Sequence, residues 1–566
     1  MNATSEKTSR PRRILLSGVF GPYGVDDEYG HKENKMELFH NQVTRAQGAA
    51  SFRFTHRSFG LYFLAANVDA DVTVLDFPSR QRFAEELLQG YDLVGISFIT
   101  PNFKKAREMA RMTRAISPRS EIVIGGHGAA IEGVEELIDC DHVVQGEGIR
   151  WLREHLGQNP DAPIVHPAIP STENQRILGV PVPGTTASLL VPGVGCPNGC
   201  NFCCTSHFFG RQYTPFLRTG RQLFETACRI ADERGTDHFF VMDENFLKHR
   251  ERAVELLEQM ERHRRWFRFH LFSSAEAIVG FGLDNLVRLG VSMLWVGFES
   301  QSRQDAYAKN SGIDAAQLVR ELRDRGISVL ASGMLCMEHH TPDNMQQDID
   351  YLIGLEPDLI QFMLYTPLPV TTLYRDHQAR GLLRDDVPFE ERHGQTKLAY
   401  RHPAFSGDEP QRWIDAAFGQ DYERNSSSLY RVAETSLRGY RRLAAMRNRD
   451  DCLEARMRQF EQQAREYALV LPALRRHAVN AVERRRCREL ERQVVATFGP
   501  PTPIERVERL AMRGFAAWWR LRLELVGDHL PHRTIVTYSP ARRTKPFGVS
   551  DLLPTPRRPV TSTPTV

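Results

Sequence analysis

The feature that most constrains this chain is a stretch rich in glycine and proline, Val194 to Gly210, that carries three spaced cysteines. Three residues separate Cys196 from Cys200, and two separate Cys200 from Cys203. An apolar run, Ala187 to Val191, precedes the stretch, whose glycines and proline oppose helix formation. The sequence therefore predicts three thiols that converge on a loop leaving a strand.

Three thiols on one loop narrow the chemistry of the site. Thiolates are soft ligands that suit zinc, copper(I) or iron–sulfur clusters. A zinc site of the finger or ribbon type needs a fourth ligand, and the chain has no second Cys-x-x-Cys pair. Three thiols therefore favour a cluster with one open iron, and the alternative is a buried cysteine cluster without metal. The adjacent Cys204 is predicted to be passive, because its side chain should point away from that of Cys203.

The Cys-x-x-x-Cys-x-x-Cys pattern, with Phe202 before its last cysteine, resembles the cluster loop of the radical S-adenosylmethionine (SAM) superfamily. The resemblance implies that Cys196, Cys200 and Cys203 hold a 4Fe–4S cluster whose open iron chelates SAM. One electron then cleaves SAM to a 5′-deoxyadenosyl radical. The resemblance also implies a partner that supplies this electron, such as a flavodoxin or a ferredoxin.

Length and composition limit the number of domains and the kinds of partner that the chain can have. A chain of 566 residues should form more than one domain. Its net charge of +3 is too small to indicate a nucleic-acid partner, and no apolar run reaches the roughly 18 residues of a membrane span. The N-terminus lacks the apolar core of a secretory signal, and three of the nine cysteines are clustered. We therefore expect metal binding in the reducing cytoplasm rather than disulfides.

Strands and helices alternate in residues 10–155, which predicts a doubly wound, Rossmann-like α/β domain that binds ligands at the carboxyl ends of its strands. One predicted strand ends at Ser97 and the next at Gly125 and Gly126. Their order and spacing resemble the Ser-x-Leu and Gly-Gly elements around the nucleotide tail of cobalamin. Glycine would let the backbone approach the ligand, and serine would form a hydrogen bond. His127 is a further candidate contact, or else a turn residue that bonds to the backbone.

The motif that ligates cobalt from below, Asp-x-His-x-x-Gly, is absent from the chain. His56 stands near its expected place, without the aspartate and with a different glycine spacing, and a loop residue is the simpler interpretation. Cobalamin-binding radical SAM enzymes often lack this histidine. The resemblance therefore still implies cobalamin as a cofactor.

Residues 156–186 are rich in Pro, Asn, Ser and Thr and are predicted to be an ordered linker. Six strand–helix units follow in residues 187–405 and predict a partial (β/α)6 barrel of parallel strands, with its chemistry at their carboxyl ends. The predicted strands are Ser188–Val191, His238–Met242, Phe269–Phe272, Met293–Val296, Val329–Leu335 and Leu359–Leu364.

Polar residues follow several of these strands. Asp243 and Glu244 resemble the acidic element that meets the amino group of SAM, since a carboxylate is a suitable acceptor for an ammonium. Ser274 and Glu299 resemble residues that reach the ribose or methionine part of SAM, or the substrate. The sequence Thr366-Pro367-Leu368-Pro369 is typical of the cobalamin-linked branch, although Val370-Thr371 replaces the usual Gly-Thr. One such ending alone would be explained by helix capping, but their order behind the cysteines favours the family.

Residues 406–530 are predicted to be helical, with helices at Tyr430–Leu443, Leu453–Leu471, Ala473–Phe498 and Ile504–Leu525. The last helix is amphipathic and contains two tryptophans among arginines. Docking on the barrel is favoured for it, and peripheral contact with a membrane surface is the alternative. Residues 531–566 are rich in Pro, Thr and Arg and are predicted to be a disordered tail.

The resemblance covers about residues 10–405 and implies a cytoplasmic radical SAM enzyme with a 4Fe–4S cluster, SAM and cobalamin. The implied reaction is methylation of an unactivated carbon of a small molecule or lipid. One alternative uses the same cofactors for carbon–carbon coupling, cyclisation or rearrangement. Another is a non-catalytic iron–sulfur or corrinoid-binding protein. The sequence assigns neither a catalytic side chain nor the identity of the substrate.

Overall fold

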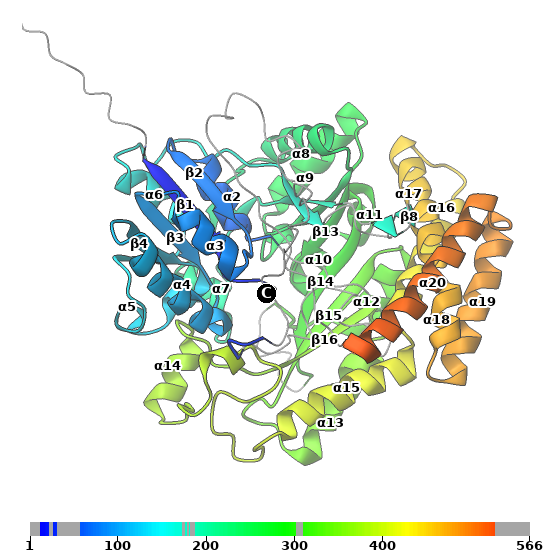
Figure 1. The fold of residues 1–566 in the computed structure, drawn as a ribbon. Helices are drawn as coiled ribbons and strands as arrows, with labels where there is room; N and C mark the ends of the chain where they lie inside the picture. Colours follow the sequence, from blue (N-terminus) through cyan, green and yellow to red (C-terminus); the bar gives the residue numbers. More distant parts are fainter. Residues whose placement is uncertain are drawn as a thin grey trace, which may run out of the picture.

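The computed structural model describes residues 12–21, 27–30, 57–172, 176–177, 180–181, 187–301 and 309–526. An N-terminal α/β domain, a central half-barrel and a layer of C-terminal helices follow one another across the molecule (Figure 1). His56 and the predicted tail, residues 531–566, lie outside the described residues.

The N-terminal domain is built on a five-stranded parallel sheet with the strand order β2-β1-β3-β4-β5. Its strands are Arg13–Gly18 (β1), Asp71–Leu75 (β2), Leu93–Ser97 (β3), Glu121–Gly125 (β4) and His142–Val143 (β5). The helices are Phe59–Ala66 (α2), Arg80–Leu87 (α3), Phe103–Ile116 (α4), Val134–Leu137 (α5) and Gly148–His155 (α6). The order reverses between β1 and β3, which is where such sheets bind ligands.

Helices cover both faces of this sheet, so its strands are apolar throughout. Ile14 and Leu16 of β1 belong to the core cluster that includes α2 and α6 residues. Leu15 points to the opposite face, where it packs with residues of α3 and α4. The predicted doubly wound domain is therefore confirmed.

The half-barrel contains a seven-stranded sheet with the order β16-β15-β14-β13-β12-β9-β6. All six predicted strands are confirmed to within a few residues and pair in parallel, as Ala187–Leu190 (β9), His238–Val241 (β12), Arg268–Phe272 (β13), Val291–Glu299 (β14), Ser328–Leu335 (β15) and Leu359–Leu364 (β16). The predicted linker contributes more than a connection, because Ile169–Thr172 (β6) pairs antiparallel with β9. Its short length and its proline hid this edge strand from the sequence.

Short ladders and helices complete the central part. Arg176–Ile177 (β7) pairs with Val180–Pro181 (β8), and Gly193–Val194 (β10) pairs with Thr214–Pro215 (β11). The helices are Cys204–Phe208 (α7), Gly220–Arg234 (α8), Arg250–His263 (α9), Ala275–Phe281 (α10), Leu283–Leu289 (α11), Ala315–Asp324 (α12), Pro342–Gly354 (α13) and Thr372–Ala379 (α14).

Local sequence signals explain where these helices begin and end. Thr219 caps α8 by accepting a hydrogen bond from the backbone N–H of Gln222, whose side chain bonds back in a capping box. The helix ends at Gly235, which has a φ of 63°. Between these points, apolar residues such as Leu223 and Ala227 form one buried face against the barrel core.

After β16 the chain returns to the N-terminal domain. There, α14 lies beside that domain (Figure 1), and Gln378 donates a hydrogen bond to Glu132 at 2.9 Å. Glu390 forms an ion pair with Lys104 of α4 at 3.4 Å. The two domains are thus joined by the segment before β9 and again by the segment after β16.

The C-terminal helices are Glu409–Asn425 (α15), Ser428–Ala444 (α16), Asp451–Ala468 (α17), Leu471–His477 (α18), Ala481–Phe498 (α19) and Pro503–Val526 (α20). The predicted single helix Ala473–Phe498 is wrong: α18 ends at His477, and Asn480 starts α19 by accepting a hydrogen bond from Glu483 at 2.8 Å. Asparagine favours the N-cap because its side chain satisfies a free backbone donor.

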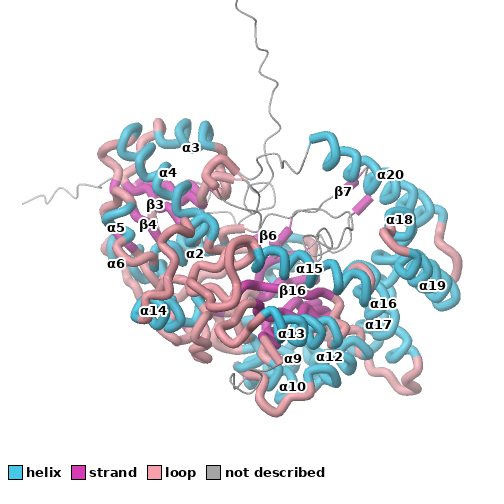
Figure 2. Tube along the Cα trace, turned by 90° about the horizontal axis from the view of Figure 1, so that it is seen from below, coloured by secondary structure: helices cyan, strands magenta, loops and turns pink. Residues whose placement is uncertain are grey.

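Helix α20 packs against α18 and β7 (Figure 2), and Glu505 in its first turn pairs with Arg465 of α17 at 3.3 Å. Trp519 is buried in this contact, whereas Trp518 is 53% exposed. The outward face carries further exposed apolar residues: Ile504, Val507, Leu510, Leu521 and Leu525. The helix therefore docks on its helical neighbours with one face and leaves a second apolar face uncovered. No described helix is long and apolar enough to span a membrane.

Candidate functional site

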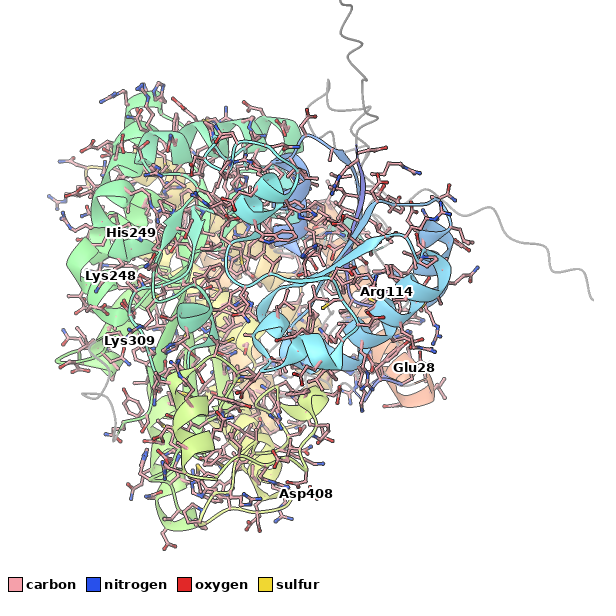
Figure 3. The ribbon with its side chains drawn as sticks, turned by 90° about the vertical axis from the view of Figure 1, so that its left-hand side faces the viewer. Glu28, Arg114, Lys248, His249, Lys309 and Asp408 are labelled. Atoms are coloured by element: carbon pink, nitrogen blue, oxygen red, sulfur yellow. The ribbon has the colours of Figure 1, made fainter. Side chains whose placement is uncertain are left out.

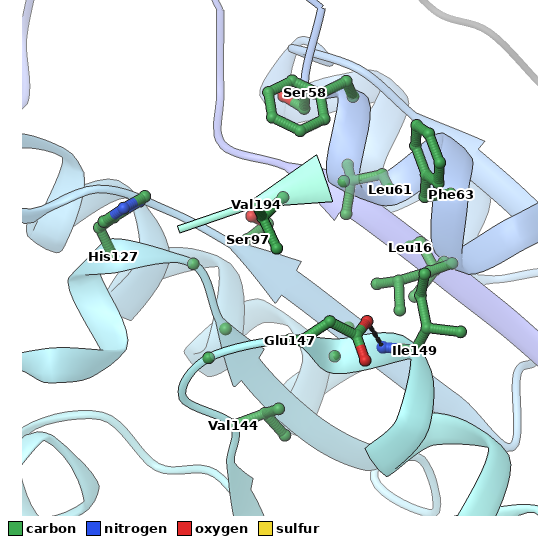
Figure 4. Close-up of a pocket in the computed structure, with 18 of the residues that line it drawn as sticks. Leu16, Ser58, Leu61, Phe63, Ser97, His127, Val144, Glu147, Ile149 and Val194 are labelled. Atoms are coloured by element: carbon green, nitrogen blue, oxygen red, sulfur yellow. Dashed lines mark hydrogen bonds between the residues drawn. The ribbon is translucent and has the colours of Figure 1, made fainter. Parts of the chain in front are cut away.

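A cavity of about 560 Å³ lies between the N-terminal sheet and the half-barrel. Ser97, Gly125, Gly126 and His127 line it from the N-terminal domain (Figure 4). The barrel side adds Val194 and Thr205 on either side of the cysteines, the aromatic residues Phe208 and Phe209, and the strand-end carboxylates Asp243 and Glu244. Predicted binding residues of both domains therefore border one space, although Cys196, Cys200 and Cys203 are themselves not among the residues that line it.

Close backbone packing holds the ends of β3 and β4 together. Ser97 pairs with Gly125 in the sheet, and Gly126 follows with a φ of +80°. A Cβ at position 126 would lie 2.6 Å from the carbonyl oxygen of Phe98 and 2.9 Å from the Ser97 hydroxyl. Only glycine fits this conformation and this space, so the backbone itself lines the cavity at this point.

His127 starts a short 3₁₀ helix, His127–Ala130, and its ring lies 4.7 Å from that of Phe208. Burial lowers the pKa of His127 to about 4, so its imidazole is neutral. Its Nε2 atom is buried and has no hydrogen-bond partner among the described residues. An unsatisfied polar atom beside a cavity is an observation that favours a ligand there.

Glu147 caps α6 at the edge of the same cavity (Figure 4). Its carboxylate accepts hydrogen bonds from the backbone N–H groups of Ile149 and Arg150. This residue was not predicted as part of the site, although an acidic side chain just before an amphipathic helix is favoured at a helix N-terminus. Its contribution is to fix the turn that carries two of the glycines lining the cavity.

The cysteine loop is pinned by the hydroxyl of Ser206, which donates to the carbonyl of Cys196 at 2.6 Å and accepts from the N–H of Gly199 at 3.1 Å. Cys203 caps α7, and its backbone N–H donates to the carbonyl of Cys200 at 3.0 Å. Burial raises the pKa of Cys203, and the neighbouring Cys200 and Cys196 add to this rise, as expected of thiols on one short loop. The loop therefore presents three thiols on a preorganised backbone.

Burial raises the pKa of all three thiols, that of Cys203 to about 12. Lys309 acts against burial at Cys200, because its positive charge favours the thiolate. Thiols held protonated by burial bind a metal only by releasing their protons. Cys204 is half-buried, as Cys203 is, and burial likewise raises its pKa to about 12.

The two carboxylates after β12 have different surroundings. Asp243 is buried and accepts hydrogen bonds from Arg252 and from the hydroxyl of Tyr213, both at 2.7 Å. The side chain of Glu244 is exposed to the cavity rather than packed against other side chains. Because this cavity lies inside the protein, desolvation raises the pKa of Glu244 to about 7, and the nearby charge of Asp243 adds to the rise. Asp243 is thus already neutralised by a cation, and Glu244 is the carboxylate that is open to a ligand.

Ser274 and Glu299 lie in neighbouring strand ends but are not among the residues that line the cavity. Ser274 is buried and bonded to the amide of Asn245 at 2.8 Å. Glu299 has a φ of +64° and pairs with Lys309, which lies on the barrel side together with Lys248 and His249, away from Arg114 of the N-terminal domain (Figure 3). Burial would lower the pKa of Lys309, and Glu299 reverses that effect to a net rise.

The last strand holds the cysteine loop from the other side. The side chain of Asn201 donates to the hydroxyl of Tyr365 at 2.7 Å, and the carbonyl of Asn201 accepts from the N–H of Leu373 at 3.0 Å. The sequence after β16, which was expected to mark the cobalamin-linked branch, therefore supports the loop directly. Val370 adopts a φ of +71° in this turn, at the position where glycine was expected.

Two family models match the chain. The model of the B12 binding domain matches residues 48–154, and the model of the Radical SAM superfamily matches residues 190–352. The first range contains β2 to β5 of the N-terminal sheet but not β1, and the second runs from the end of β9 into α13. The two predicted cofactor-binding regions thus coincide with the two matched families.

Several characterised proteins are similar to this chain over part of their length. Anaerobic magnesium-protoporphyrin IX monomethyl ester cyclase of Cereibacter sphaeroides is 21% identical over 365 residues, which cover 55% of this chain and 56% of that protein. Bacteriochlorophyllide d C-8(2)-methyltransferase of Chlorobaculum tepidum is 24% identical over 321 residues, or 52% of this chain and 70% of that protein. Hopanoid C-2 methylase of Rhodopseudomonas palustris is 26% identical over 204 residues, or 34% and 38%.

Among solved structures, the radical S-adenosylmethionine methyltransferase TsrM of Kitasatospora setae, with cobalamin and a 4Fe–4S cluster bound, matches with a TM-score of 0.53. The match covers 80% of this chain and 99% of that chain at 16% identity. At this identity the likeness establishes the fold: an N-terminal α/β domain, a partial barrel and C-terminal helices in the same arrangement.

Proposed function

We propose that this chain, which belongs to the radical SAM enzymes that carry a B12-binding domain, methylates an unactivated carbon of its substrate. The family assigns it a 4Fe–4S cluster, SAM and cobalamin. When bound, these groups supply hydrogen-atom abstraction and a transferable methyl group. The protein's part is to bind them, orient them and exclude water.

The observation that carries the proposal is the shared cavity. Its walls combine the strand ends of the B12-binding domain with residues on both sides of the cysteine triad. A methyl donor bound at one wall could then act on a substrate carbon activated at the other, without diffusion through water. Few of its lining residues are charged, as an apolar substrate or the edge of a corrin would require.

Each residue has a proposed role that matches its surroundings. Cys196, Cys200 and Cys203 would hold the cluster, because they are free thiols on a preorganised loop. Glu244 would accept from the amino group of SAM, while Asp243 would hold Arg252 and the strand end in place. Ser274 and Glu299, which do not line the cavity, would act by holding the neighbouring strand ends in place through Asn245 and Lys309.

On the other wall, Ser97, Gly125, Gly126 and His127 would bind cobalamin. The support comes from the close approach of the two strand ends and from the unpartnered Nε2 of His127. The neutral ring could donate a hydrogen bond from this nitrogen to a carbonyl or phosphate of the ligand.

The cysteine assignment is tested by two neighbouring substitutions. Cys203→Ala should abolish the iron content and the broad visible absorbance of anaerobically purified protein. Cys204→Ala is the matched control, since this thiol is equally buried and one residue away, and it should keep both signals. Equal iron in the two variants would overturn the assignment.

The reaction is tested by incubating reduced enzyme with SAM, methylcobalamin and candidate substrates. Methylation predicts 5′-deoxyadenosine together with a product heavier by one methylene, labelled when the methyl group of SAM is labelled. Cyclisation is the second candidate, because the similar protein of Cereibacter sphaeroides is a cyclase. It predicts 5′-deoxyadenosine without label transfer. A non-catalytic binding protein predicts no cleavage of SAM at all.

For the substrate, the uncovered apolar face of α20 supports a lipid or another membrane-associated molecule. Its six exposed apolar side chains recur at helical spacing, and arginines such as Arg506 and Arg513 flank them. Such a face can rest at the surface of an anionic bilayer. The family also predicts an electron donor such as a flavodoxin or a ferredoxin. It predicts a cytoplasmic location as well.

A further inference from the structure

A group of metal-binding side chains lies at the end of the N-terminal sheet opposite the cavity. Glu121 is the first residue of β4, His142 the first of β5 and His155 the last of α6. The Nε2 of His155 lies 2.7 Å from an oxygen of Glu121, and the Nε2 of His142 lies 3.7 Å from the same oxygen. We propose that these three residues form a site for a divalent transition-metal ion, with zinc as the natural occupant.

The donor set and its spacing support an ion. Two imidazoles and one carboxylate suit zinc, which binds these atoms at about 2.0–2.2 Å in a tetrahedron, so that the ligand atoms lie about 3.4 Å apart. Here one nitrogen or oxygen from each residue lies within 4.8 Å of the others, an upper limit that includes the spacing expected around zinc. The side chains are 21–38% exposed, so water can enter and fill the fourth position.

Neighbouring groups already hold the ligands in place. The ring of His155 stacks on Trp151 at 4.9 Å with an angle of 8°, and the ring of His142 lies 5.5 Å from the same tryptophan. Arg12 approaches the other oxygen of Glu121 at 3.7 Å and leaves the oxygen shared by the histidines for the ion. Such support fixes ring orientation, as metal sites require.

Two other groups of metal-binding side chains are less suitable. In the first, His340 is already bonded through both nitrogens, to the Met337 N–H and to Asp348, each at 2.9 Å. In the second, Arg380 occupies the carboxylates of Glu338 and Asp376. In the first group the Met337 N–H fixes the imidazole proton on the nitrogen that faces Asp348, and in the second a guanidinium already neutralises the carboxylates.

The position of the site predicts a structural role. The three ligands lie at the ends of β4, β5 and α6, and the opposite ends of these elements carry Gly125, Val144 and Glu147 at the cavity. An ion would fasten an edge strand of only two residues to its neighbours. It would thereby stabilise the domain without taking part in the reaction.

The test uses full-length, cluster-loaded protein, so that the cysteine triad is occupied in every sample. Zinc chloride is titrated under anaerobic conditions after removal of loosely bound metal, and bound zinc is measured by mass spectrometry. The wild type should bind one more zinc per chain than His142→Ala. Glu121→Gln keeps a hydrogen-bond acceptor for His155 and should weaken zinc binding more than about tenfold.

The control is His263→Ala, which removes an exposed histidine of α9 and should leave zinc binding unchanged. Added zinc should raise the melting temperature of the wild type and of this control, but not that of Glu121→Gln. Equal zinc stoichiometry and equal zinc-induced shifts in the wild type and Glu121→Gln would overturn the proposal and leave a hydrogen-bonded cluster. If His142→Ala does not fold, Glu121→Gln still decides.

Discussion

The tight contact between Gly126 and Phe98 makes a quantitative prediction. In Gly126→Ala, the alanine would have to keep a φ of +80° and a ψ of 178°, and its Cβ would lie 2.6 Å from one backbone oxygen. This backbone conformation is populated essentially only by glycine and costs about 1–3 kcal/mol for a residue with a Cβ. The clash adds about 1–3 kcal/mol, because a backbone atom cannot move aside as a flexible side chain can. We therefore expect a total loss of about 2–6 kcal/mol.

Gly133→Ala is the control for a positive φ without a clash. Gly133 lies in the same domain in the left-handed α conformation, with a φ of +65°, and the nearest atom to its Cβ would be a Glu136 oxygen at 3.9 Å. This variant should lose only about 1–2 kcal/mol. The free energy of local opening, measured by amide hydrogen exchange in β3 and β4, should therefore fall further in Gly126→Ala.

The same pair tests the role of the strand ends in binding. Separating β3 from β4 moves Ser97 relative to His127, so Gly126→Ala should lower cobalamin affinity in equilibrium dialysis, and Gly133→Ala should keep it. If both variants open with the same free energy and bind cobalamin equally well, the close packing does not shape the cavity and the reasoning fails.

Three further predictions rest on other contacts. Arg252→Met leaves Asp243 buried without its cation, so it should cost about 3–5 kcal/mol of folding stability and lower the melting temperature. Arg221→Met removes an exposed pair with Glu225 and should change the melting temperature little. Equal effects of the two substitutions would contradict a structural role for the buried pair. Burial lowers the pKa of His166 to about 3, so the unfolded chain binds the extra proton as pH falls below about 6.5, and about 2 kcal/mol is lost by about pH 5. His166→Asn, which can still accept from Val191, should flatten the melting temperature between about pH 5 and 8, and parallel curves would refute this. Trp518→Asp should reduce sedimentation with anionic vesicles if α20 contacts membranes, whereas Leu137→Asp, an exposed residue of the N-terminal domain, should not.

Much of the fold could be predicted because the hydrophobic runs and the turn residues between them indicate the same boundaries for helices and strands. The predicted alternation of strands and helices in residues 10–155 is observed, and the predicted barrel strands differ by only a few residues. The errors lie where that agreement breaks down. Strand β6 is too short to show a pattern, and the break before α19 depends on the single cap Asn480.

The residues of the candidate site could be predicted from the sequence, but most of their contacts could not. The cysteine spacing and the strand-end glycines can be read from the sequence, because each reflects a local requirement of the backbone or of a ligand. The sequence could not assign different surroundings to Asp243 and Glu244. That difference depends on Arg252, nine residues along the chain on a separate helix, and long-range pairing of this kind has no local signature.

The chain crosses between its two domains twice, once before β9 and once after β16, and the second crossing is fastened by Gln378 and Glu390. Any motion that separates the domains must bend the chain at both crossings and break these two contacts. Domain separation therefore carries a free-energy cost, and the two walls of the cavity keep their distance while these contacts hold.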